Sequence, residues 1–113
     1  MLLLTMVIAP SCASVVVEKP FEAYKVEFYK GRNLPEVSIT MGHIQDDVTV
    51  AQCFPGSWPF LPRHITVDAD WWEMYKDEPT VQRNIIYHEL GHCALGLDHS
   101  VRGTMSPYVE GWE

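Results

Sequence analysis

The chain has 113 residues, of which 47% are hydrophobic and 20% are charged. These values are ordinary for a globular protein and exclude intrinsic disorder, collagen-like structure and a long coiled coil. A chain of this length has room for one domain with a modest core. The formal net charge of -7 excludes the clustered basic surface that nucleic-acid binders need, so we expect no nucleic-acid partner.

The start of the chain predicts export. Residues 2–9 are apolar, a run too short to span a bilayer but long enough for the apolar region of a secretory signal. A signal peptide could be cleaved after Ala13, or Cys12 could carry a lipid as in a lipoprotein signal, which would be the one expected contact with a membrane. We expect residues 1–14 to be a signal and residues 15–113 to form a single domain that is secreted, periplasmic or lipid-anchored at the membrane surface.

Two cysteines remain after either processing route, Cys53 and Cys93. An even number of cysteines in an oxidising compartment predicts a disulfide between them. The alternative is two buried free thiols, because cysteine is among the most buried residue types.

Four segments are predicted as strands, because apolar residues alternate in them or because they are rich in β-branched and aromatic residues. The first is ended by the turn at residues 31–33, and the third is closed by Pro55-Gly56. The Pro-rich stretch at residues 55–62 cannot join a central ladder. The four predicted strands are residues 24–29, 37–44, 48–54 and 64–67.

The helices are predicted in the second half of the chain. Residues 69–77 favour a short helix, although two adjacent tryptophans would equally suit the end of a strand. A longer helix is predicted from Pro79 or the next residue to about residue 95, since proline is tolerated in a first turn and Gly96 can end the helix. Residues 97–113 are typical of turns. Strands followed by a helix and an irregular tail make an α+β domain.

The longer helix carries the chemistry. The sequence HELGH at residues 88–92 places His88 and His92 on one face of a helix, where they can share a metal ion. Glu89 lies about 100° from His88 around the helix, within reach of a metal-bound water without being a ligand. Apolar residues on the opposite face would anchor the helix to the sheet: Ile86, Leu90 and Cys93.

A third ligand must come from outside this helix, because zinc in hydrolases commonly has three protein ligands and an open fourth position. Gly96 can adopt the left-handed conformation that turns the chain back. His99 follows three residues later and is placed to approach the same ion. We therefore predict Zn²⁺ held by His88, His92 and His99.

These residues resemble a known family. HELGHCALGLDH at residues 88–99, followed by TMSPY, is similar to the metzincin clan of zinc peptidases, and GLDH is most similar to its matrixin branch. The resemblance implies a small zincin domain with a short mixed sheet packed on the active-site helix and an irregular C-terminal tail. Met105 would form the Met-turn beneath the metal. More weakly, VAQCFPG at residues 50–56 resembles the edge strand along which matrixin substrates lie.

The chain departs from the family pattern at one point. Six residues separate His92 from His99, where the family has five, and the additional residue falls before Gly96. Strict counting would place Asp98 in the ligand position. His99 is favoured because imidazole suits zinc and the Gly-x-x-His turn is intact, and Asp98 would then be a partner of a ligand.

The function implied is that of a zinc metalloendopeptidase acting on a peptide or protein substrate. Zinc lowers the pKa of a bound water towards about 7, and Glu89 takes its proton as general base. Tyr108 could stabilise the oxyanion, although packing is the commoner role of such a tyrosine. Two alternatives remain open: a catalytically inactive zinc-binding or interaction module of the same fold, and a zinc amidase that acts on cell-wall peptide.

Other conspicuous residues have simpler interpretations. Histidines in strand-like segments are expected to be structural, and tryptophans are expected to pack in the core more often than to line a substrate groove. Aspartate pairs could hold calcium, but solvated turns are the default without a recognisable loop spacing. The residues concerned are His43, His64, Trp58, Trp71, Trp72, Asp46, Asp47, Asp68 and Asp70.

Overall fold

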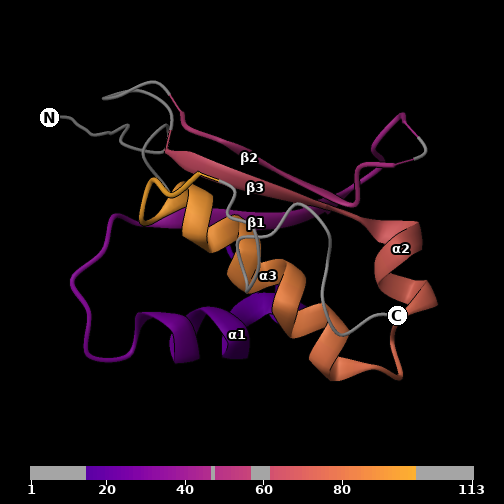
Figure 1. Ribbon diagram of the computed structural model, residues 1–113, viewed down its shortest axis with the longest axis horizontal. Helices are drawn as coiled ribbons and strands as arrows, with labels where there is room; N and C mark the ends of the chain where they lie inside the picture. Colours follow the sequence, from indigo (N-terminus) through magenta and orange to yellow (C-terminus); the bar gives the residue numbers. More distant parts are fainter. Residues whose placement is uncertain (1–14, 47, 57–61, 99–113) are drawn as a thin grey trace, which may run out of the picture.

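The computed structural model describes residues 15–46, 48–56 and 62–98, and in these ranges the elements follow the order α1, β1, β2, β3, α2, α3 (Figure 1). A short sheet combined with helices confirms the predicted α+β class. Several predictions fall outside the described residues: the signal at residues 1–14 with Cys12 and Ala13, and those on Asp47, Trp58, His99, Met105 and Tyr108.

Helix α1 spans Lys19–Tyr29, so the strand predicted over residues 24–29 is wrong. The alternation in that segment is also compatible with a helical spacing, and Pro20 in the first turn favours the helix. Three aromatic residues, spaced by three and then four positions, pack into or against the core: Phe21, Tyr24 and Phe28. The first is fully buried, and its ring centroid lies 4.8 Å from that of Trp72. Tertiary packing therefore decided the conformation of this segment.

The sheet has three strands in the order β1-β3-β2. Strand β1 (Val37–Gly42) runs parallel to β3 (Arg63–Asp68), and β2 (Ala51–Phe54) is antiparallel to β3. Val17 adds an isolated parallel bridge to the outer side of β1. The last three predicted strands are confirmed, with shifts of one to three residues at their ends. Within the described residues β2 forms one edge of the sheet.

Helix α2 (Ala69–Met74) confirms the short helix predicted within residues 69–77. Asp68 caps it, because its carboxylate accepts hydrogen bonds from the backbone N–H groups of Trp71 and Ile44, each at 3.0 Å. These bonds hold the pKa of Asp68 below its ordinary value. A role in capping thus explains this aspartate without a calcium ion.

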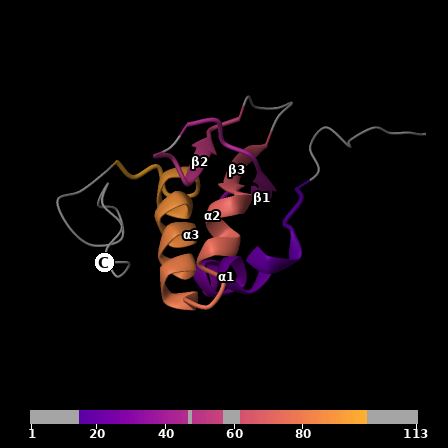
Figure 2. The same ribbon diagram turned by 90° about the vertical axis from the view of Figure 1, so that its right-hand side faces the viewer.

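Helix α3 (Pro79–Cys93) is the longest helix among the described residues, and its position confirms the second predicted helix. Helices α1 and α3 lie on the same side of the sheet, as two perpendicular views show (Figures 1 and 2). The sheet residues that face them are fully buried: Val37, Ile39, Ile65 and Val67. Trp71 and Trp72 are also buried, which confirms their predicted place in the core.

Candidate functional site

The C-terminal half of α3 is fixed to the sheet by its apolar face. Ile86, Leu90 and Cys93 are at most 1% exposed, which confirms that this face anchors the helix. Cys53 of β2 and Cys93 form a disulfide with a Cα–Cα distance of 5.7 Å, so the predicted bridge is present. In addition, the Arg63 guanidinium donates a hydrogen bond of 2.8 Å to the Cys93 carbonyl oxygen at the helix end. The polar face of the helix is therefore carried by a rigid element.

His88 and His92 lie together on that face. Their Nε2 atoms are 3.2 Å apart, and their ring centroids are 4.8 Å apart with the rings nearly perpendicular. Two nitrogens that bind one tetrahedral zinc ion at 2.0–2.1 Å must be about 3.3–3.4 Å from each other. The observed separation fits that requirement. The helical spacing thus brings the two predicted ligands into a geometry that can hold a metal ion.

The ring of His92 is oriented by the backbone. Its Nδ1 lies 2.7 Å from the Leu97 carbonyl oxygen, and because a carbonyl can only accept, Nδ1 carries the hydrogen. In the neutral ring the lone pair is then on Nε2, the atom that faces His88. A backbone carbonyl that fixes the tautomer of a histidine is the arrangement commonly found behind metal ligands. Leu97 could not be predicted from the sequence, because a backbone contact leaves no trace in residue identity.

Glu89 is 6% exposed, and among the described residues no side chain or backbone group forms a hydrogen bond or ion pair with its carboxylate. Burial raises its pKa to about 7, since transfer out of water disfavours the charged form. Burial of a carboxyl is costly for a folded chain unless a partner or a change of its protonation compensates. Its position next to His88 makes it the strongest candidate for proton transfer in this part of the chain.

The chain turns sharply at the end of α3. Gly96 has a φ of 68°, the left-handed conformation predicted for it. Backbone N–H groups of Gly96 and Leu97 donate to the carbonyl oxygens of His92 and Gly91 at 3.1 and 2.9 Å. These bonds satisfy carbonyls at the helix end and bring Leu97 back beside His92.

The third ligand is not tested by this structure, because His99 lies outside the described residues. Within residues 15–46, 48–56 and 62–98, no group of three or more His, Cys, Asp or Glu side chains could hold a metal ion. Asp98 is exposed and does not complete a set with His88 and His92. Two of the three predicted ligands, His88 and His92, therefore lie in the described part of the chain.

The remaining histidines lie in other surroundings. His64 of β3 contacts the Thr40 hydroxyl of β1 through Nε2 at 2.8 Å, in agreement with a structural role. His43 is exposed. Asp46 accepts hydrogen bonds from the N–H groups of Val48 and Thr49 at 2.9 and 2.6 Å, which is the expected geometry of a capped turn.

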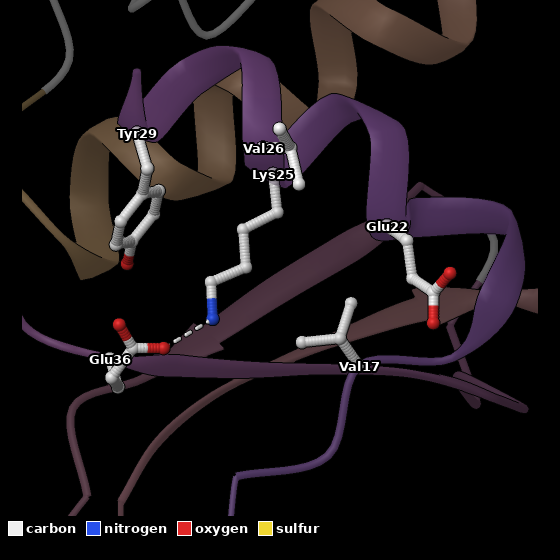
Figure 3. A pocket seen from close by; sticks show the side chains of 6 residues that line it. All are labelled: Val17, Glu22, Lys25, Val26, Tyr29 and Glu36. Atoms are coloured by element: carbon white, nitrogen blue, oxygen red, sulfur yellow. Dashed lines mark hydrogen bonds and ion pairs between the residues drawn. The ribbon is translucent and has the colours of Figure 1, made fainter. Parts of the chain in front are cut away.

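A separate hollow of about 380 Å³ lies between α1 and β1, on the far side of α1 from its contact with α3 (Figure 3). Lys25 reaches across it from α1 and donates to the Glu36 carboxylate at 2.7 Å and to the Val37 carbonyl at 3.1 Å. The ammonium thus satisfies a carbonyl of the outer strand, one way in which proteins protect sheet edges. Lys25 is explained by this structural role.

Comparison of the chain with known protein families, with curated proteins and with solved structures finds no match. Among the helices of the described residues, none is long and apolar enough to cross a membrane. The geometry around α3 is therefore the basis on which a function can be argued.

Proposed function

We propose that this protein is an exported, zinc-dependent metalloendopeptidase in which His88, His92 and His99 hold Zn²⁺ and Glu89 is the general base. The observation that carries the proposal is the pair of Nε2 atoms 3.2 Å apart, on a helix that is fixed to the sheet and that carries the buried Glu89 next to His88 in the sequence. A purely structural zinc site needs no such carboxyl. Glu89 therefore favours an enzyme over an inactive zinc-binding module.

Each residue has a definite task in this proposal. Zinc, when bound by these histidines, supplies Lewis-acid polarisation of water and of the peptide carbonyl. Glu89 accepts a proton from the attacking water and passes it to the leaving amine. The low-dielectric surroundings of its carboxyl keep the proton affinity high enough for this transfer. The Leu97 carbonyl keeps the His92 ring in the tautomer that offers Nε2.

An extended peptide is the substrate class we propose. Strand β2 is an edge of the sheet within the described residues, and an edge presents backbone N–H and C=O groups to which another extended chain can pair. The disulfide joins this strand to the helix that carries the histidines. The same disulfide supports export, since such bonds persist in oxidising compartments.

The decisive experiment combines metal analysis with a peptide library. We expect the purified full chain to bind one equivalent of zinc and to cleave internal bonds of library peptides, with activity lost on chelation and restored by zinc. Glu89→Gln should keep its zinc and lose about 10²- to 10⁴-fold in kcat. Glu73→Gln is the matched control, because that carboxylate is exposed on α2 and should leave turnover unchanged.

Four results would contradict the proposal. Absence of stoichiometric zinc would remove the metal centre altogether. Zinc binding without cleavage of any peptide would favour the inactive module, and hydrolysis confined to cell-wall peptides would favour the amidase. Full activity of Glu89→Gln would exclude this residue as the base.

A further inference from the structure

The last turn of α3 is tied to two different strands through one residue. The Cys93 sulfur is bonded to Cys53 of β2, and the Cys93 carbonyl oxygen accepts the hydrogen bond from Arg63 of β3. Cys93 itself is 1% exposed. The backbone carbonyl that Arg63 contacts is one of those that a helix end leaves without an intrahelical partner. These two ties, the disulfide and the Arg63 hydrogen bond, therefore fix a part of the helix that would otherwise be prone to fraying.

This turn also positions the candidate metal ligands. His92 immediately precedes Cys93, and its ring is oriented by Leu97, four residues after Cys93. Movement of the turn relative to the sheet would move the Nε2 atom of His92 with it. Fixing Cys93 to β2 and β3 thus fixes the histidine pair relative to the strands.

Strand β2 depends on the same ties. It has only four residues, and within the described residues its one strand neighbour is β3. Cys53 lies in the middle of the pairing, opposite Ile65. Its side chain is directed to α3, whereas the neighbouring residues Gln52 and Phe54 are exposed, as the alternation of a strand requires. The disulfide is therefore a covalent contact between β2, an edge of the sheet within the described residues, and the helix with the histidines.

We infer that Cys53, Cys93 and Arg63 are positioning residues that hold the edge strand β2 and the His88–His92 pair in a fixed spatial relation. A peptide paired along β2 would then present one of its carbonyl groups at the histidine pair without further adjustment. Such preorganisation matters because a small misplacement of reacting groups lowers rates strongly. This inference rests on the proposed peptidase function and specifies how an extended substrate is aligned.

The test compares long and short substrates. For the double variant Cys53→Ala/Cys93→Ala of the full chain, we expect the KM of a ten-residue library substrate to rise about tenfold, because alignment along β2 is lost. The same substrate truncated to the two residues that flank the cleaved bond cannot pair along β2, so its kcat/KM should change by less than about twofold. Arg63→Met should show a smaller rise for the long substrate, and Arg63→Lys should restore part of the alignment because lysine keeps a donor.

Ile39→Ala is the matched control, because this fully buried residue lies in β1, away from both ties. The melting temperatures of Ile39→Ala and of the double variant should both fall. In Ile39→Ala, however, the ratio of kcat/KM for the long substrate to kcat/KM for the short substrate should not change. Hydrogen exchange of the β2 amides supplies a readout that needs no activity. The double variant should exchange them faster than Ile39→Ala does when the two are compared at equal distance below their melting temperatures.

An equal loss of kcat/KM for long and short substrates would overturn the inference, as would β2 exchange rates that match those of the control. If the wild-type chain cleaves no peptide at all, the proposed function fails. The exchange comparison still decides in that case whether the two ties hold β2 against α3.

Discussion

At the scale of single residues, the properties of Glu89 depend strongly on the fold. The unfolded chain would titrate this carboxyl near the value of 4.5 for an ordinary glutamate, whereas burial raises its pKa to about 7 in the folded chain. The folded state therefore binds more protons than the unfolded state between these values. Stability contributed by Glu89 is fully present below pH 4.5 and is lost as the pH rises through 7.

This difference gives a prediction for the zinc-free chain. Between pH 4.5 and pH 8, the wild type should lose about 3 kcal/mol more unfolding free energy than Glu89→Gln, because a shift of one pKa unit corresponds to 1.36 kcal/mol. Urea denaturation at several pH values in the presence of a chelator measures the difference. Parallel pH profiles for the two proteins would show that the carboxyl is not desolvated. Subtracting the profiles removes the contribution of histidines that both proteins share.

At the scale of elements, α1 and α3 are joined by a small polar cluster. The Glu27 carboxylate of α1 accepts hydrogen bonds from the Tyr87 hydroxyl at 2.6 Å and from Arg83 Nε at 3.0 Å, both on α3. These donors hold the pKa of Glu27 below its ordinary value. The Tyr87 ring also packs edge-on against Phe28, with 5.0 Å between centroids. The cluster fixes how α3 rests on α1.

Removal of one hydroxyl tests this contact. Tyr87→Phe should lower the free energy of unfolding by a small but measurable amount, because the solvent-exposed hydrogen bond to Glu27 is lost while the ring packing is retained. Tyr24→Phe is the control, because within the described residues the Tyr24 hydroxyl forms no hydrogen bond and its loss should be close to neutral. Chemical denaturation of both variants gives the comparison. Equal effects of the two substitutions would contradict a specific role for Tyr87.

The same elements show what sequence patterns can and cannot predict. Helix α3 was predicted because its start, its glycine end and its histidine spacing all indicate one conformation. Residues 24–29 carry two compatible patterns, and the choice was made by the packing of Phe21 against Trp72, a contact between residues 51 positions apart in the sequence. The orientation of His92 by Leu97 was likewise unpredictable, since any residue offers a carbonyl. Local patterns predict helices and strands, and tertiary contacts select the conformation where a segment is compatible with both.

At the scale of the whole molecule, metal binding and folding are expected to be linked. Ligands that converge only in the folded chain make the metal bind the native state in preference to the unfolded one. Free zinc at about 100 times its dissociation constant should then stabilise the chain by about 2.7 kcal/mol. For a domain of this size, that corresponds to a rise in melting temperature of roughly 10–20 °C. Thermal unfolding with zinc and with a chelator measures the rise.

Single substitutions in this assay identify the third ligand. His88→Ala and His92→Ala should lose most of the rise, and His99→Ala should do the same if its imidazole completes the set. Asp98→Asn should keep the rise, because the carboxylate is exposed and lies apart from the histidine pair. His43→Ala, in an exposed histidine outside the site, controls for nonspecific zinc binding. In the reverse outcome, zinc stabilisation is lost in Asp98→Asn and kept in His99→Ala. The ligand would then be the Asp98 carboxylate, because zinc stabilises the folded state only through groups that bind it there.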